Sequence, residues 1–150
     1  MPYDDLRKGR YSEAHRAYFV TTVLAERQLR LFADLAIARL VVAEMRALHE
    51  SGTVNSFAWV VMPDHVHWLF QLGESIDLSA TVKRFKACSA HRVNRRLNRQ
   101  GPLWQRAFHD HALRAEEDVK DIARYIVANP LRAGLARHIG DYPLWDAAWL

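Results

Sequence analysis

The sequence predicts one α+β domain in which helices pack against a single antiparallel β-sheet. Segments rich in β-branched and aromatic residues alternate with longer segments whose apolar residues recur at helical spacing. Two strand-like segments are separated only by Pro63 and Asp64, and so short a connection allows only an antiparallel pair. With 150 residues, half of them apolar, the chain is long enough for one core and short for two. We therefore expect a single domain over residues 1–150, with a basic arm over about 1–16 and a tail over about 137–150.

The first half of the chain supplies three predicted strands and one predicted helix. Residues 18–24 are rich in β-branched and aromatic side chains, which favours a first strand. Residues 29–49 carry apolar side chains at helical spacing and end at a Ser-Gly pair, which predicts a helix. Residues 54–62 and 65–72 are the second and third strands, joined by the Pro-Asp turn.

The second half supplies two more helices and a fourth strand. Residues 79–98 form a basic amphipathic pattern that a Gly-Pro pair ends, and residues 103–114 are predicted to be a strand. Three acidic residues at 116–118 favour the start of a last helix, which should end at about Asn129, before Pro130. The order β-α-β-β-α-β is the ferredoxin-like split pattern, here with an additional C-terminal helix. We expect the helices to pack on one side of the sheet.

The basic residues are unevenly distributed along the chain. The net charge is only +4, yet residues 78–108 contain no acidic residue and eight basic ones. These are Lys83, Arg84, Lys86, Arg92, Arg95, Arg96, Arg99 and Arg106. Such a run is either a solvated helix face or the electrostatic footprint of a polyanion such as nucleic acid.

Neither a secretory nor a membrane-spanning segment is predicted. Charges occur throughout the first thirty residues, and no apolar run approaches the roughly 20 residues that a membrane helix needs. The single cysteine, Cys88, cannot form an internal disulfide and is consistent with a reducing cytosol. We expect a cytoplasmic protein without a membrane partner.

Two histidines on the third predicted strand are candidate metal ligands. His65 and His67 are two residues apart, so strand alternation directs both imidazoles to the same face. Histidines at this spacing are also common as ordinary polar residues of a strand. Two nitrogen ligands leave a metal site incomplete, so a third ligand would be required.

A tyrosine near the end of the last predicted helix is a candidate nucleophile. Tyr125 and Asn129 are four residues apart, a little over one turn, and share a helix face. The alternative is a core tyrosine with its hydroxyl at the rim, followed by an asparagine that ends the helix. A free phenol has a pKa near 10, so a catalytic tyrosine needs activation or a polarised electrophile, which a metal ion on a phosphate supplies.

Four motifs in order resemble those of a known family. The segment M-P-D-H-V-H at residues 62–67, with an apolar strand after it, resembles the HUH motif of single-strand transposases. The segment Y-I-V-A-N-P-L-R-A-G-L at residues 125–135 is similar to the tyrosine helix of the REP-associated tyrosine transposases, within the IS200-like group. Residues 9–12 leading into 18–21, and residues 103–111, also resemble that family. The aligned pieces extend from about residue 7 to residue 145.

The resemblance implies a role for each matching residue. His65 and His67 would be ligands of Mg²⁺ or Mn²⁺, which accept mixed donors and leave positions for phosphate. Asn129 occupies the third ligand position. Tyr125 would attack a DNA phosphate, leaving a 5′-phosphotyrosine and a free 3′-hydroxyl. The expected activity is cleavage and rejoining of single-stranded DNA at REP-type hairpins.

Other expected roles concern support of the metal site and contact with DNA. Asp110 or His111 would face the metal site as a partner of its ligands if residues 103–114 lie beside the third strand. The basic helix would contact phosphates through Lys83, Arg84, Lys86, Arg92, Arg95, Arg96 and Arg99. By resemblance, Arg7, Arg10 and Ser12 would read a short guide sequence beside a hairpin, whereas an ordinary N-terminal arm frays.

Two other functions are compatible with parts of the sequence. One is a domesticated, non-catalytic protein that binds hairpin DNA sequence-specifically; the presence of His65, His67 and Tyr125 argues against it. The other is an RNA-binding ferredoxin-like module, which would carry exposed aromatic residues on central strands where this chain has a histidine pair. Whether the protein is a monomer or a homodimer stays open.

Overall fold

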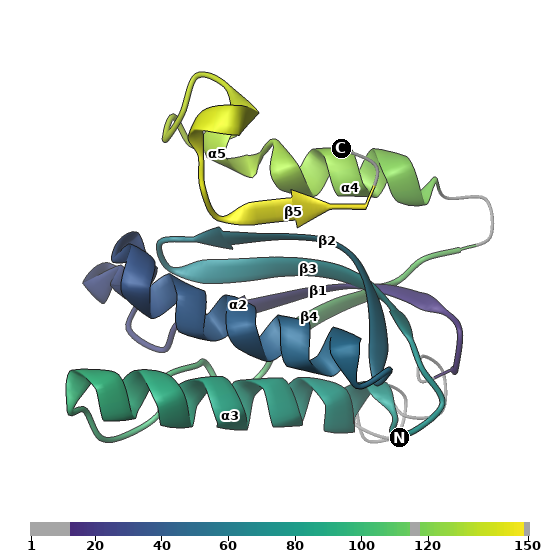
Figure 1. Cartoon of the computed structure of the whole chain (residues 1–150), viewed down its shortest axis with the longest axis horizontal. Coiled ribbons are helices and arrows are strands. Elements are labelled where there is room, and N and C mark those ends of the chain that lie inside the picture. The colour runs from purple at the N-terminus through teal and green to yellow at the C-terminus, as the bar shows by residue number, and fades with distance from the viewer. Residues whose placement is uncertain (1–12, 115–117, 149–150) are drawn as a thin grey trace.

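The computed structural model describes residues 13–114 and 118–148, and these form a five-stranded sheet with helices on both faces (Figure 1). The strands are β1 (Ala17–Val23), β2 (Val54–Met62), β3 (His65–Leu72), β4 (His109–Ala112) and β5 (Trp145–Ala147). The helices are α2 (Leu35–Glu50), α3 (Leu78–Leu97), α4 (Val119–Val127) and α5 (Asn129–Arg132), with short 3₁₀ turns η1 (Arg27–Leu29), η2 (Leu31–Ala33) and η3 (Ile139–Asp141). The strand order is β4-β1-β3-β2-β5, and every pairing is antiparallel. The predicted α+β class and the ferredoxin-like order are confirmed.

The β2–β3 hairpin has the predicted bounds, but the first helix begins later than predicted. Arg30 adopts a left-handed φ of 46°, which separates two 3₁₀ turns and prevents one continuous helix from residue 29. The α-helix starts after Asp34, whose side chain accepts hydrogen bonds from the N–H groups of Ala36 and Ile37. Asp77 caps α3 in the same manner through the N–H of Ala80.

The fourth strand is much shorter than the predicted range of residues 103–114. Before residue 109 the chain makes only an isolated bridge, between Trp104 and Leu24. Trp104 is buried, and its Nε1 donates to Ser89 Oγ on α3 at 3.0 Å. Lys86 Nζ, also on α3, donates to the carbonyls of Gln105 and Arg106. These contacts tie the segment to the helix, while the N–H of Gln105 donates to the carbonyl of Val23 at the end of β1, so the segment does not continue as a strand.

The prediction that all helices lie on one side of the sheet was wrong. In Figure 1, α2 and α3 cover one face, while α4 lies across the other. The apolar side chains of α4 pack against a second core of strand residues, which includes Val60 and Leu69. The neighbouring Val61, Trp68 and Phe70 pack toward α2 and α3. Such continuous apolar runs are typical of strands covered on both faces.

The end of the chain adds elements that were not predicted. The last long helix stops at Val127, and α5 follows as a separate short helix with Pro130 in its first turn. The tail then forms β5, which pairs with β2. Trp145 in that strand packs on the second core. None of the helices described has both the length and the apolar character needed to span a membrane.

Candidate active site

The face of the sheet covered by α4 gathers the two histidines and the tyrosine. His65 and His67 share this face, as strand alternation predicts, with ring centroids 4.7 Å apart. Phe19, on the adjacent strand β1, has ring contacts with both a histidine and the tyrosine. Its ring centroid is 5.4 Å from that of His67 and 6.4 Å from that of Tyr125 on α4. Residues that are 58 positions apart in sequence, His67 and Tyr125, thus line one small region.

His65 is held by a chain of charged groups. Its Nδ1 lies 2.7 Å from Asp64 Oδ1, and Arg27 Nε donates to Asp64 Oδ2 at 2.8 Å. Burial by itself would raise the pKa of the Asp64 carboxyl, but the hydrogen bonds from His65 and Arg27 hold that pKa below its ordinary value. An ionised carboxylate can only accept, so Nδ1 of His65 carries the proton. In the neutral ring, the lone pair of Nε2 is then available to a metal ion.

His67 is kept neutral by its surroundings. Burial lowers the pKa of His67 to about 3, and the charges of His65 and Arg132 act in the same direction. Its Nδ1 is 2.8 Å from Thr21 Oγ1, the residue directly opposite on β1. When Nδ1 donates to this hydroxyl, Nε2 again presents a lone pair. A neutral imidazole is the form that binds metals.

Tyr125 lies at the surface beside the histidine pair. Its side chain is 53% exposed, whereas the next residue, Ile126, is fully buried beneath α4. The alternative of a core tyrosine is therefore wrong. Arg132 lies over the tyrosine ring, with Cζ 4.0 Å from the ring centroid, and its Nη2 donates to the backbone carbonyl of Tyr125 at 2.7 Å. An exposed phenol within this site can meet a large substrate without movement of the core.

Asn129 offers a third polar group, one helical turn after the tyrosine. Its side-chain nitrogen is buried and makes no hydrogen bond with the described part of the chain. Nitrogen and oxygen of an amide are distinguished only by their partners, so this orphaned end is equally suited to present oxygen. A buried polar group without a partner is costly unless a ligand or water satisfies it.

These donors fit a divalent cation. Among the residues described, no three His, Cys, Asp or Glu side chains cluster closely enough to hold a metal. A metal at His65 and His67 would therefore need the Asn129 amide, the substrate or water as further ligands. Imidazole nitrogens are ligands for transition-metal ions and an amide oxygen is a ligand for Mg²⁺ or Mn²⁺, so a divalent cation held here would still have positions open for phosphate oxygens.

The β1–β4 register decides which residues of β4 face this site. His109 and His111 lie opposite Thr21 and Phe19, on the face of the histidine pair. Asp110 lies opposite Val20 and so faces α2 and α3. Of Asp110 and His111, the two residues predicted to support the metal site, only His111 therefore lies on the face of the histidine pair. His109, to which the sequence assigned no role, shares that side.

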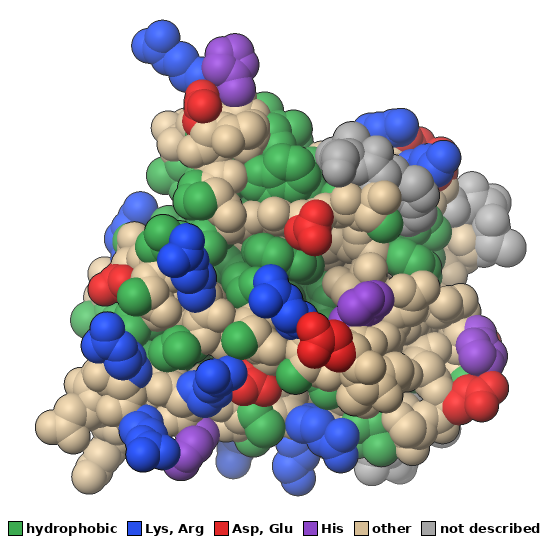
Figure 2. Space-filling view, viewed as in Figure 1, with side chains coloured by type: hydrophobic (Ala, Val, Ile, Leu, Met, Phe, Trp, Pro, Cys, Tyr) green, Lys and Arg blue, Asp and Glu red, His purple; other side chains and the backbone are tan. Residues whose placement is uncertain are grey.

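The basic helix is not part of this site, because α3 packs on the opposite face of the sheet. Arg92 pairs with Glu44 at 3.1 Å, and burial lowers the pKa of Lys86, which is bonded to backbone carbonyls. The exposed predicted contacts are Lys83, Arg84, Arg92, Arg95 and Arg96, whereas Lys86 and Arg99 are half-buried. Figure 2 shows basic side chains spread over the α2–α3 side. Arg7, Arg10 and Ser12 lie outside the described residues.

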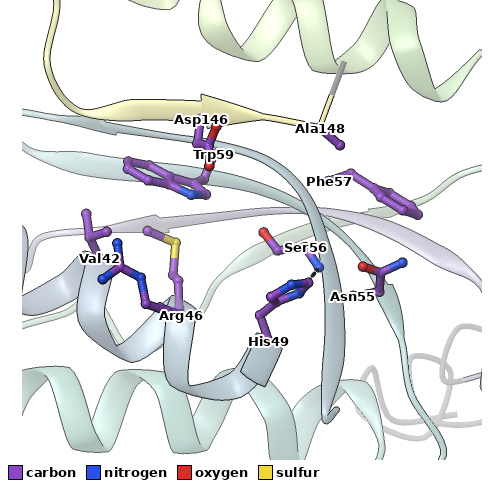
Figure 3. Close-up of a pocket in the computed structure, with 10 residues that line it drawn as sticks. Val42, Arg46, His49, Asn55, Ser56, Phe57, Trp59, Asp146 and Ala148 are labelled. Atoms are coloured by element: carbon purple, nitrogen blue, oxygen red, sulfur yellow. Dashed lines mark hydrogen bonds between the residues drawn. The ribbon is translucent and has the colours of Figure 1, made fainter. Parts of the chain in front are cut away.

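A separate pocket of about 360 Å³ lies between α2 and the β2–β5 edge (Figure 3). Trp59 and Arg46 line it, and His49 Nδ1 accepts a hydrogen bond from the N–H of Ser56. Trp59 pairs with Trp68 and packs against the α2–α3 core. The pocket is therefore on the face away from the histidine pair.

The sequence matches a described family and individual relatives. The family "Transposase IS200 like" matches residues 15–129. A Haemophilus influenzae protein described as a REP-associated tyrosine transposase is 29% identical over 140 residues, covering 84% of this chain and 76% of its own length. A REP-associated tyrosine transposase of Escherichia coli K12 is 31% identical over 87 residues, covering 57% of this chain and 50% of its own.

The fold also matches solved structures. A REP-associated tyrosine transposase bound to a REP hairpin superposes with a TM-score of 0.76 at 25% identity, covering 91% of this chain and 79% of that one. A Deinococcus radiodurans protein described as a transposase gives a TM-score of 0.56 at 21% identity, covering 76% of this chain and 91% of that one. The second likeness shows the fold alone.

Proposed function

This chain belongs to the IS200-like transposase family, and we propose that it is a tyrosine transposase that cleaves and rejoins single-stranded DNA at REP-type hairpins. The observation that carries the proposal is the position of Tyr125. Phe19 contacts both the exposed ring of Tyr125 and the ring of His67, a neutral imidazole. The relatives described as REP-associated and the relative bound to a REP hairpin support a hairpin substrate.

The proposed reaction is a transesterification at phosphorus. The Tyr125 oxygen forms a bond to the phosphorus, and the bond from phosphorus to the 3′ oxygen of the preceding nucleotide breaks. The phenol proton passes to solvent, and the departing 3′ oxygen takes a proton from solvent. The products are a 5′-phosphotyrosine and a free 3′-hydroxyl, so the bond energy is retained and a 3′-hydroxyl can reverse the step.

His65, His67 and Asn129 are the residues that would hold Mg²⁺ or Mn²⁺. Such an ion, when bound, supplies positive charge to the phosphoryl oxygens and orients the phosphate for in-line attack. The protein's own contribution is to keep the His67 imidazole neutral and to occupy the Nδ1 atoms of both histidines. Asp64 and Thr21 therefore orient the ligands, a role of hydrogen-bond partners around many metal sites.

A covalent-adduct assay tests the proposal. The protein is incubated with labelled REP-type hairpin oligonucleotides and Mn²⁺ or Mg²⁺, and protein–DNA adducts are separated under denaturing conditions. We expect an adduct with the wild type that a chelator abolishes and that Tyr125→Phe eliminates, while Tyr125→Phe still binds the hairpin. An adduct formed by Tyr125→Phe would reject Tyr125 as the nucleophile. Binding without cleavage across a panel of hairpins would favour the non-catalytic hairpin-binding protein instead.

A further inference from the structure

Arg132 lies against the side chain and backbone of the candidate nucleophile, Tyr125. Its guanidinium lies 4.0 Å from the centre of the Tyr125 ring and is anchored by the hydrogen bond to the Tyr125 carbonyl. A cation is therefore held against the ring of the candidate nucleophile.

The charge of Arg132 is not neutralised by the described part of the protein. Among residues 13–114 and 118–148, no Asp or Glu pairs with Arg132, and its only hydrogen bond is to the Tyr125 carbonyl. Arg124, one residue before the tyrosine, differs in this respect because it pairs with Asp121 at 3.0 Å. A guanidinium has five N–H donors in a planar fork that matches phosphate, so most donors of Arg132 are available to a substrate.

We propose that Arg132 is a second catalytic residue, which contacts the non-bridging oxygens of the phosphate that Tyr125 attacks. This inference rests on the proposed function. The phosphoryl oxygens carry the negative charge in the transition state, and a preorganised cation beside them lowers the barrier. The bond to the Tyr125 carbonyl and the stacking on the ring hold the guanidinium before the substrate arrives, so little reorientation is needed.

A purely structural role of Arg132 and a catalytic role predict different effects of its replacement. If Arg132 only fixes the tyrosine ring, its loss should slow attack on any phosphorus centre. If it balances phosphate charge, its loss should matter little for an uncharged centre. A methylphosphonate, in which one non-bridging oxygen is replaced by methyl, provides such a centre.

The experiment measures single-turnover adduct formation with a hairpin that the wild type cleaves, with phosphodiester or methylphosphonate at the mapped cleavage position. On the phosphodiester, Arg132→Gln should be slower by about 100-fold, and Arg132→Lys should recover part of the rate because it keeps the charge without the fork. Arg124→Gln, the matched control, should stay within about twofold, because the arginine removed there is already paired. On each methylphosphonate isomer, wild type and Arg132→Gln should differ by less than about threefold, because there is less charge to balance.

Each outcome decides between the roles. Equal slowing of Arg132→Gln on both substrates would reduce Arg132 to a support for the ring. An unchanged rate on the phosphodiester would remove it from the site. No adduct with the wild type on any hairpin would overturn the proposed function, and the role of Arg132 with it. Hairpin affinity measured in chelator, which should fall by no more than the loss of one phosphate contact in Arg132→Gln, shows that the variant is folded and binds.

Discussion

Asp64 Oδ1 and His65 Nδ1 are 2.7 Å apart, and this bond directs Nε2 of His65 away from the carboxylate. Arg27 holds the other carboxylate oxygen at 2.8 Å, so Asp64 is fixed from two sides. The aspartate that forms the hairpin turn therefore also orients the first of the two proposed ligands.

Replacing Asp64 should weaken metal binding. Without the carboxylate, the His65 ring loses the partner that sets its tautomer and orientation, and loss of such a partner typically lowers metal affinity by about 10- to 100-fold. We expect this loss for Asp64→Ala in calorimetric titration with Mn²⁺. Glu74→Ala is the matched control, since it removes an exposed carboxylate bonded to His15 at 2.7 Å, at the other end of β3. Equal Mn²⁺ affinities for Asp64→Ala and the wild type would exclude the orienting role.

Adjacent threonines on β1 provide a second test. Thr21→Val removes the hydroxyl that lies 2.8 Å from His67 Nδ1 while keeping the shape of the side chain. We expect a lower Mn²⁺ affinity, because the ring is then free to rotate and to change tautomer. Thr22 faces the other core, and its buried hydroxyl has no partner in the described structure. Thr22→Val should therefore keep Mn²⁺ affinity and raise the free energy of unfolding by about 1 kcal/mol; a loss of affinity in both variants would indicate a general disturbance of β1.

Elements whose own pattern decides their structure could be predicted from the sequence. The bounds of β2 and β3 match, because a segment rich in apolar residues on each side of a two-residue turn leaves few alternatives. The position of α4 could not be predicted, because strand periodicity does not say which helix covers which face. Residues 103–108 belonged to the predicted fourth strand, yet Trp104 donates a hydrogen bond to Ser89 on α3. Such tertiary contacts are not encoded in local periodicity.

The candidate site likewise has features that the sequence predicts and features that it does not. The shared face of His65 and His67 follows from alternation within one strand, and the sequence predicts it. The contact of Thr21 with His67 depends on the register between β1 and β3, which a single sequence does not determine. Arg132 is two helical turns after Tyr125, and that spacing is the one signal that could have drawn attention to it. Because the helix breaks between α4 and α5, helical spacing alone does not predict that the side chains of Arg132 and Tyr125 are in contact.

The stability of the metal-free protein should decrease as the pH falls below about 6.5, the ordinary histidine value. The pKa of His67 is about 3 in the folded state, so between these values the unfolded chain binds a proton that the folded chain does not. The free energy of unfolding should then rise with pH by about 1.4 kcal/mol per pH unit from this residue. Urea unfolding in chelator between pH 4.5 and 6 measures the slope. His67→Gln, which cannot titrate, should lose this contribution; equal slopes for the two proteins would contradict the lowered pKa.

The exposed arginines of α3 should control the salt dependence of DNA binding, although they lie on the opposite face of the sheet from Tyr125. Each lysine or arginine that contacts a phosphate releases counterions, so its loss lowers affinity and flattens the plot of log affinity against log salt. We expect a reduction of the slope by about one for each of Arg95→Gln and Arg96→Gln. Arg92→Gln should have a smaller effect, because its guanidinium is already paired with Glu44 at 3.1 Å.

Fluorescence anisotropy of a labelled hairpin over a range of salt concentrations measures these slopes. A flattened slope in both variants would mean that the DNA contacts α3 as well as the face that carries Tyr125. A hairpin whose stem is bound apart from the cleaved strand would make both contacts. A slope unchanged in Arg95→Gln, Arg96→Gln and the double variant would remove α3 from the interface. The binding charge would then have to come from the tyrosine face, where Arg132 is unpaired among the described residues.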